Sequence, residues 1–254
     1  LFIIGASIGS FLNVLIDRLP KDESINDRSH CDYCGKKIAW YDLIPVFSFF
    51  ILGGKTRCCH KKLSWQYPLV EIITGISFLL IFNFQFSIFN EFSIINFQTF
   101  ILFGIVSCFI VIFFSDLKYH LISDYIQVAF FIFSIIYHLR SIISFSSFFH
   151  FFISSFVVAF PIWLIYFLSK ERAMGLGDVF LALNIGFLLG WQAGFLALYI
   201  AFVTGAIFGL FLILLKRKKI KSKISFGPFL VIGTIIMLFY SNIVWEIISK
   251  IYRF

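Results

Sequence analysis

The stretch "ERAMGLGDVFLALNIGFLLG", residues 171–190, changes from charged to apolar within a few positions. Asp178 lies behind Gly175 and Gly177, where the apolar run begins. An ionisable group at the edge of a membrane segment is costly and is often functional. A simpler interpretation is that Asp178 caps a helix start, where the helix dipole favours an anion. The rest of the chain decides between these two interpretations.

The composition indicates a membrane protein. Of the 254 residues, 60% are hydrophobic, 21% are aromatic and only 13% are charged, and the mean hydropathy is +0.97. A soluble domain has about a quarter charged residues, so we expect an all-α, polytopic protein embedded in the lipid bilayer. No signal peptide pattern is visible. The chain begins at Leu1, already inside an apolar run, so its natural N-terminus is expected to be missing or trimmed.

The apolar segments predict a membrane helix bundle with about eight transmembrane helices, because a helix needs about 20 apolar residues to cross a bilayer. The sixth segment is short, and Gly190-Trp191-Gln192 separates it from the seventh. The predicted spans are residues 1–19, 68–89, 97–115, 125–143, 149–168, 179–190, 193–215 and 225–248.

The basic residues are segregated, which orients the predicted bundle. With the N-terminus outside, 18 of the 21 Lys and Arg residues fall in inward segments and three fall in outward segments. Basic residues mark cytoplasmic loops, so the net charge of +8 is interpreted as a topology signal and not as a nucleic-acid site. The run "KRKK", residues 216–219, is expected to anchor the inner end of the seventh helix.

Two aspartates are expected at the same membrane boundary, because Asp116 closes the third predicted span and Asp178 opens the sixth. Two carboxyl groups in one site cannot easily both ionise, so they share a proton. The ionised one can take a proton from water, while the neutral one donates to a substrate carbonyl oxygen. The helix ends favour an ionised Asp178 and a protonated Asp116. Gly175 and Gly177 suit unusual backbone angles or the close approach of a peptide.

Several stretches together resemble the prepilin peptidases (type IV leader peptidases), a family of Gly-x-Gly-Asp membrane aspartic proteases. Presenilin-like proteases share "GLGD", but their usual Tyr-Asp is Ser115-Asp116 here. The combination and order of the matches are specific, whereas "GxGD" alone is weak. The matching stretches are "GASIGSFLNVLIDRLP" (5–20), "RSHCDYCGKKIAWYDLIPVFSF" (28–49), "YPLVE" (67–71), "DLKYHLISD" (116–124) and "GLGD" (175–178).

The resemblance implies an endopeptidase that removes the basic leader from type IV prepilins or pseudopilins, at the cytoplasmic face of the bacterial cell membrane. Such enzymes serve pili, secretion or competence. Asp116 and Asp178 match the catalytic pair. Asp124 receives no catalytic role, because it follows Ser123 where the family usually has Pro. Many members then methylate the new N-terminus with S-adenosylmethionine.

The chain would then divide into a first transmembrane helix (1–19), a cytoplasmic loop with a zinc site (20–66) and a transmembrane peptidase core (67–254). The loop carries "CDYC" at 31–34 and "CC" at 58–59. Cytosolic cysteines stay reduced, so paired cysteines suggest zinc and not a disulfide.

The cysteine pattern departs from the two C-x-x-C pairs that the resemblance implies, which would give a tetrahedral four-sulfur site. Thr56 stands where the third family cysteine is expected, and Cys58 is extra. The alternative to a zinc site is a loop held by packing and basic contacts. The expected ligands are Cys31, Cys34, Cys59 and either Cys58 or His60.

Other functions stay open at this point. The chain could be another Gly-x-Gly-Asp protease, an ion-coupled transporter built on helix carboxylates, or an inactive relative that acts as a scaffold. No internal repeat is evident, which disfavours a transporter. Asn13 either bonds across helices or shapes the substrate groove. Glu71 either pairs with a loop cation or contacts the substrate amine or the methyl donor.

Overall fold

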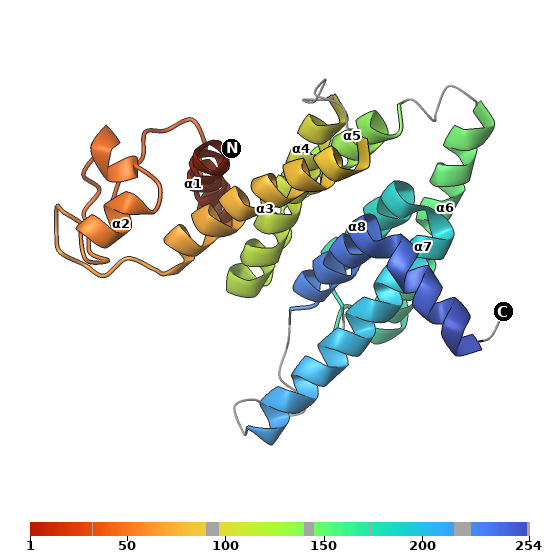
Figure 1. Ribbon diagram of the computed structural model, residues 1–254. Coiled ribbons are helices and arrows are strands. Elements are labelled where there is room, and N and C mark those ends of the chain that lie inside the picture. The colour runs from red at the N-terminus through yellow and green to blue at the C-terminus, as the bar shows by residue number, and fades with distance from the viewer. Residues whose placement is uncertain (32, 90–96, 140–144, 173, 216–224, 253–254) are drawn as a thin grey trace. The chain divides into compact units, whose positions relative to one another are not determined.

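The computed structural model describes the whole chain except residues 32, 90–96, 140–144, 173, 216–224 and 253–254. Among the described residues the regular secondary structure is helical, and the loop after the first helix adds two isolated bridges (Figure 1). This confirms the predicted all-α class. The α-helices are α1 (Phe2–Arg18), α2 (Phe47–Ile51), α3 (Gln66–Phe89), α4 (Phe97–Tyr119), α5 (Asp124–Tyr137), α6 (Phe145–Ser169), α7 (Leu176–Leu214) and α8 (Gly227–Tyr252), and short 3₁₀ turns cover Leu19–Lys21 and Trp40–Leu43.

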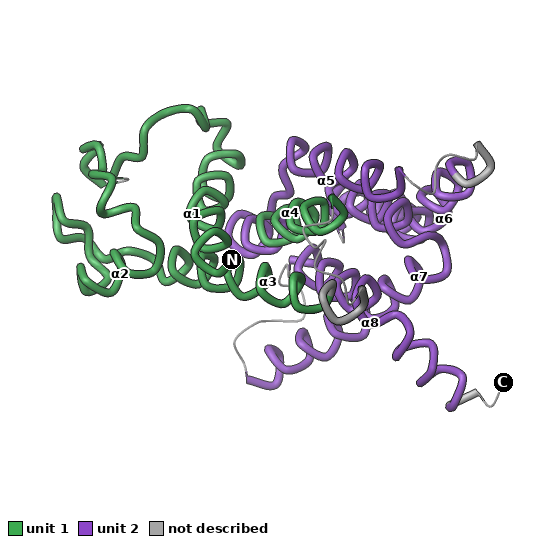
Figure 2. Tube along the Cα trace, turned by 45° about the horizontal axis from the view of Figure 1, so that its top comes forward, with its two compact units in different colours: residues 1–111 green, residues 112–254 purple. Residues whose placement is uncertain are grey.

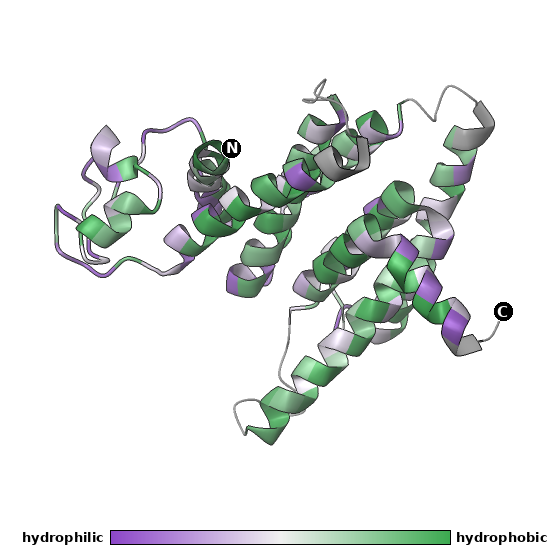
Figure 3. Ribbon diagram, viewed as in Figure 1, coloured by the Kyte–Doolittle hydropathy of each residue, from purple (hydrophilic) through white to green (hydrophobic). Residues whose placement is uncertain are grey.

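Six of these helices are long and apolar enough to cross a membrane, so the chain is an integral membrane protein. Figure 3 shows apolar residues along these helices and polar residues gathered on the loop between α1 and α3. Helix α7 runs for 39 residues but has a non-helical residue, Gly190, with φ 76° and ψ 173°. The predicted separation between the sixth and seventh segments is therefore confirmed at Gly190.

The fourth predicted span is shorter in the structure than in the sequence reading. Helix α5 has 14 residues and is therefore about 21 Å long, less than the roughly 30 Å of a bilayer core. The end of that predicted span, Arg140 and the run at 216–219 lie outside the described residues. The predicted orientation of the bundle stays a prediction.

The chain forms two compact units, Leu1–Val111 (unit 1) and Ile112–Phe254 (unit 2), coloured separately in Figure 2. The predicted division at residues 19 and 66 stays a prediction. In unit 1, α1 packs closely on α3. A Cβ atom on Gly5 would lie 2.8 Å from the Gly75 Cα, and one on Gly9 would lie 2.7 Å from the Glu71 Cα. Small residues let the helix backbones approach, and here they bring Glu71 against α1.

In unit 2, α7 packs against α6 and α8. Its first half is apolar on every side and is largely buried, as expected of a central helix. A Cβ atom on Gly186 would lie 2.7 Å from the Ser154 carbonyl oxygen, so α6 and α7 touch through their backbones. This packing holds the first turn of α7, which carries Asp178, in a defined position.

Candidate active site and cysteine cluster

Asp116 lies in the last turn of α4 and is buried, with 6% of its surface exposed. The backbone N–H of Gly227 donates to its Oδ2 at 2.9 Å. Gly227 is the first residue of α8, so Asp116 also faces the start of a helix. The Ser225 hydroxyl donates to the Asp116 backbone carbonyl at 2.8 Å and lies 2.7 Å from Nδ1 of His120. The carboxyl group is thus held by a segment that lies more than 100 residues away in the sequence.

Asp178 is the third residue of α7 and is half-buried. Its Oδ2 accepts a hydrogen bond from the Gly175 backbone N–H at 3.2 Å, so the aspartate also caps the helix. Neither motif glycine has a left-handed conformation, and Gly175 has φ −86°. A Cβ atom on Gly177 would lie 3.3 Å from the Ile122 Cβ, which makes close packing the reason for this glycine. Of the two reasons expected for these glycines, unusual backbone angles are therefore not found, and the close approach of a peptide stays a prediction.

The two carboxyl groups are close enough to interact electrostatically, which is the arrangement that the sequence predicted. Two helix ends act on Asp116 in opposite directions, however. The C-terminal end of α4 disfavours an anion there, whereas the N-terminal end of α8 favours one. The assignment of the shared proton to Asp116 stays a prediction, and the helix dipoles no longer support it on their own.

A buried amide pair holds the turn that carries Asp178. Nε2 of Gln127, on α5, donates to the Gly177 carbonyl at 2.9 Å. Nδ2 of Asn184, about two turns further along α7, donates to Oε1 of Gln127 at 3.0 Å. Both side chains are buried, so the pair satisfies itself and clamps the glycine turn to α5.

These partners of the aspartates were missed by the sequence analysis. Gly227-Pro228 is a helix-start signal that could have been noticed, since Pro favours the first helical turn. Nothing in the local sequence of Gln127 or Asn184 distinguishes them from ordinary polar residues in a span. The contact of His120 with Ser225 was not expected either.

Unit 2 also contains a cavity of about 380 Å³ beside this amide pair. Four phenylalanines and Val128 and Leu183 give it a mainly apolar lining, and Asp124 lies exposed at its edge. Its phenylalanines are Phe131, Phe152, Phe156 and Phe180, from helices α5, α6 and α7.

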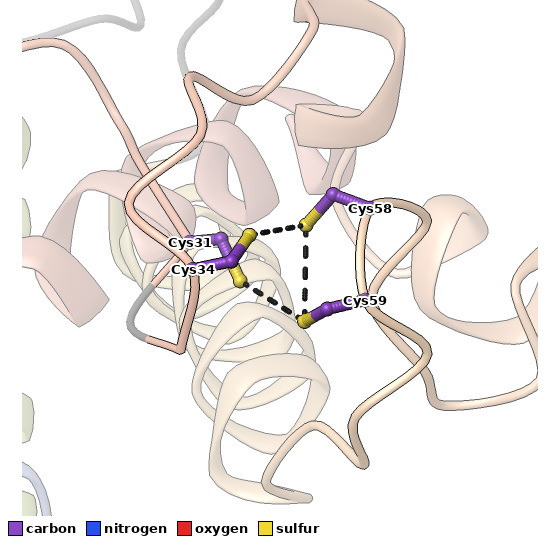
Figure 4. A group of neighbouring side chains, drawn as sticks. All are labelled: Cys31, Cys34, Cys58 and Cys59. Atoms are coloured by element: carbon purple, nitrogen blue, oxygen red, sulfur yellow. Dashed lines mark hydrogen bonds between the residues drawn. The ribbon is translucent and has the colours of Figure 1, made fainter.

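The four loop cysteines lie together in unit 1 (Figure 4). The sulfur–sulfur distances are 3.7 Å between Cys31 and Cys59, 3.2 Å between Cys34 and Cys58, and 4.0 Å between Cys58 and Cys59. A tetrahedral site with Zn–S bonds of about 2.3 Å requires sulfurs about 3.8 Å apart. The four sulfurs therefore fit a zinc ion. Among the described residues, His60 is not part of this group of ligand atoms, so Cys58 completes it.

Two similar turns present these cysteines. In the first turn, the Cys31 N–H donates to the Lys36 carbonyl at 2.9 Å, and the Gly35 N–H donates to the Cys31 carbonyl at 2.8 Å. In the second turn, the Thr56 N–H donates to the Lys61 carbonyl at 2.8 Å, and the His60 N–H donates to the Thr56 carbonyl at 2.9 Å. Gly35 in the first turn and His60 in the second both have positive φ. The residues of the second turn that match Cys31, Gly35 and Lys36 are Thr56, His60 and Lys61.

Thr56 thus occupies in the second turn the position that Cys31 has in the first, but its hydroxyl contacts the sulfur of Cys59. Its Oγ1 lies 3.1 Å from the Cys59 sulfur, and this hydrogen bond lowers the pKa of the Cys59 thiol to about 7. The hydrogen bond with Cys34 raises the pKa of Cys58 to about 12. Zinc binds thiolates, so metal binding here would release protons.

Comparisons with known proteins agree with this arrangement. Residues 3–85 match the bacterial peptidase A24 N-terminal domain, and residues 102–210 match the type IV leader peptidase family. Two prepilin leader peptidase/N-methyltransferases are similar along most of the chain. That of Pectobacterium carotovorum subsp. carotovorum is 29% identical over 91% of this chain and 88% of its own, and that of Dickeya chrysanthemi is 28% identical over 92% and 89%.

The similarity is highest in a shorter part of the chain. The prepilin leader peptidase/N-methyltransferase of Myxococcus xanthus is 48% identical over 31% of this chain and 24% of its own. No solved structure matches the chain. The two family models occur in order and together cover more than half of the chain, and the chain belongs to the type IV leader peptidase family.

Proposed function

We propose that this protein is a membrane aspartic endopeptidase that removes the basic leader from type IV prepilins or pseudopilins. The observation that carries the proposal is the pairing of Asp116 with Asp178, each held through one carboxyl oxygen by a backbone N–H. Membership of the family and the names of the similar proteins support the same reaction.

The chemistry follows from two carboxyl groups that share one proton. The ionised group removes a proton from a water molecule, and the water oxygen bonds to the scissile carbonyl carbon. The protonated group donates its proton to the carbonyl oxygen. The tetrahedral species then collapses and the C–N bond breaks. The leaving amine takes up a proton from one aspartate, while a hydroxyl of the tetrahedral carbon returns its proton to the other, so the pair again holds one proton.

The substrate would place its hydrophobic helix in the bilayer and its cleavage point at the membrane boundary. The aromatic cavity beside the Gln127–Asn184 pair offers apolar surface in the same unit as the aspartates. The 18 inward basic residues out of 21 support a site that faces the cytoplasm.

Methylation of the new N-terminus is the second half of the proposal and rests on the names of the relatives. S-adenosylmethionine would supply the methyl group as an electrophile on a sulfonium. Zinc at Cys31, Cys34, Cys58 and Cys59 would be structural, because four sulfurs fill a tetrahedral shell and leave no position for substrate.

The experiment that tests the proposal is a mass spectrum of a prepilin-like substrate incubated with membranes that contain the protein and S-adenosylmethionine. Asp116→Asn and Asp178→Asn are each expected to lower the cleavage rate by about 10³-fold or more, because each removes one half of the acid–base pair. Cleaved product that carries one added methyl group would establish the second activity.

The matched control is Glu246→Gln, which neutralises an exposed carboxylate of α8 that pairs with Lys250. It is expected to cleave at the wild-type rate. Cleavage that survives either aspartate substitution would contradict the assigned pair.

A further inference from the structure

Unit 1 contains a polar cavity of about 190 Å³ in which none of the proposed catalytic groups takes part. It lies where α1, the start of α3 and the loop between them meet. Four carboxylates, a buried arginine and a lysine line it together with uncharged polar and apolar groups. Its polar lining residues include Asn13, Asp17, Arg18, Tyr67 and Glu71.

Asn13 presents an unpartnered acceptor in this cavity lining. Its side chain is 3% exposed, and Nδ2 donates to the Tyr67 carbonyl at 3.1 Å. The contact with a carbonyl fixes the orientation of the amide, because a flipped amide would set two acceptors against each other. Oδ1 is buried and has no hydrogen-bond partner. Buried acceptors are nearly always satisfied, so this oxygen indicates a missing donor.

Glu71 adds a buried carboxylate to the same lining, with 7% of its surface exposed. Its Oε2 accepts a hydrogen bond from the Val46 N–H at 2.7 Å. In the part of the chain that the structure describes, no Lys, Arg or His forms an ion pair with Glu71. A buried carboxylate that forms no ion pair within the protein is suited to receive a cation from a ligand.

The cavity also carries a fixed positive charge. The guanidinium of Arg18 is buried and donates to the carbonyls of Ser24 and Asp27, both at 2.9 Å. Those acceptors are neutral, so its charge is not cancelled by them. Asp17 accepts a hydrogen bond from the Tyr67 hydroxyl at 2.9 Å. A lining with both signs of charge suits a ligand that is both a cation and an amino acid.

We propose that this cavity binds an organic cation through Glu71 and Asn13, and that the cation is the amino-acid and sulfonium end of S-adenosylmethionine. The enclosed volume is smaller than the whole donor, so the adenosyl group would extend beyond it. The inference rests on the methyl-transfer half of the proposed function. A second source of the same chemistry is the ammonium group at the N-terminus of a cleaved pilin.

Equilibrium binding of radiolabelled S-adenosylmethionine to the purified full chain tests the proposal, without any pilin present. Glu71→Gln is the decisive variant, because its amide oxygen can still accept the Val46 hydrogen bond while the charge is lost. The dissociation constant is expected to rise at least about tenfold, as expected when a buried charge partner is neutralised. Glu246→Gln, an exposed carboxylate on α8, is expected to bind like the wild type.

Competition with S-adenosylhomocysteine gives a readout that does not depend on how much protein is folded. This analogue lacks the sulfonium charge, so the wild type is expected to prefer S-adenosylmethionine. Glu71→Gln is expected to lose that preference. Equal affinity of wild type and Glu71→Gln for the methyl donor would overturn the proposal.

Two further arms separate the ligand sources and the two activities. A short peptide with an N-terminal Phe, free or acetylated, is measured in the same way. Glu71-dependent binding of the free amine, with none of the donor, would overturn the assignment to S-adenosylmethionine. If the wild type cleaves the leader but does not bind S-adenosylmethionine, this inference is overturned and the proposed peptidase function is not. Donor binding that survives in Asp178→Asn would support a site separate from the peptidase pair.

Discussion

The aspartate site of unit 2 is built on helix ends, whereas the cysteine cluster of unit 1 is built on two short turns. Each aspartate is held by a backbone N–H at the start of a helix, α8 for Asp116 and α7 for Asp178. The cysteines depend on local backbone bonds that repeat between the turns. The aspartate site (the helix-end site) has both residues at the positions that the motifs predict. The cysteine cluster (the turn site) takes one of its four sulfurs from Cys58, because position 56 is a threonine.

The two sites differ in whether a functional residue can be replaced by one at a neighbouring position in the sequence. A helix end fixes a side chain through packing that involves distant segments, so its residues cannot be exchanged for neighbours. A turn at the surface can present a sulfur from either of two positions, and Cys58 stands in for Thr56. The following predictions test this contrast, beginning with the largest effect.

Gly227→Ala tests the helix-end site. A Cβ atom at Gly227 would lie 2.6 Å from Oδ2 of Asp116, so the carboxyl group must move. We expect the cleavage rate to fall by about 100-fold, since a displacement of about 1 Å in a catalytic group costs that much. The measurement is kcat for leader removal.

Two other glycines provide the comparison. A Cβ atom on Gly175 meets nothing closer than 3.9 Å, and one on Gly205 meets a Phe229 ring at 3.4 Å. Both Ala variants are expected to be milder than Gly227→Ala. A larger loss for Gly175→Ala would show that the motif glycine matters for a reason other than its surroundings in this structure.

Cys58→Ser tests the turn site. We expect the zinc affinity of the purified chain to fall at least about tenfold, because one of four sulfur ligands is lost. The double variant Cys58→Ser with Thr56→Cys is expected to recover zinc, since Thr56 occupies the turn position that Cys31 has in the first turn. Metal analysis after dialysis against a chelator series measures both. Unchanged zinc in Cys58→Ser would remove Cys58 from the ligand set.

Gln127→Leu tests whether catalysis depends on the hydrogen bond from Gln127 to the Gly177 carbonyl. Loss of the bond to the Gly177 carbonyl frees the first turn of α7 from α5, and we expect kcat to fall about tenfold. KM is expected to change less, because the clamp acts on the turn that carries Asp178. Gln192→Leu, an exposed position on α7, is the matched control.

The partner of Gln127 gives a further check. Asn184 contacts Gln127, so adding Asn184→Leu to Gln127→Leu is expected to cost little more than the single change. Full additivity of the two losses in kcat would mean that Gln127 and Asn184 act independently. The hydrogen-bonded pair would then not hold the Gly177 turn as proposed.

Thr56→Val has the smallest expected effect. The hydroxyl is the main cause that lowers the pKa of Cys59 to about 7, so its removal raises that pKa toward the ordinary value of 9.0. At pH 7 the thiolate fraction, and with it the alkylation rate of chelator-treated protein, is expected to fall about twofold for a rise of about half a unit. An unchanged profile of alkylation rate against pH would contradict the role of the Thr56 hydroxyl.

Much of the fold could be predicted from the sequence because its signals are local. Apolar runs predicted the membrane helices, and Gly190 predicted the break in α7. Asp116 and Asp178 were expected to meet because both lie at helix ends on one side of the predicted bundle. The four-cysteine group was expected as well, although the choice between Cys58 and His60 was left open.

By itself, the sequence determined the class of the protein and its family, because apolar runs and short motifs along the chain carry both. It also predicted the pair of aspartates and the group of loop cysteines, since each of these residues lies in such a motif. The tertiary structure decided that Gly227 and Ser225 hold Asp116, that Gln127 clamps the Gly177 turn, and that Glu71 and Asn13 line one cavity. These contacts join residues about 50 to 110 positions apart. Helix packing alone sets which of them meet, so no local pattern could have indicated them.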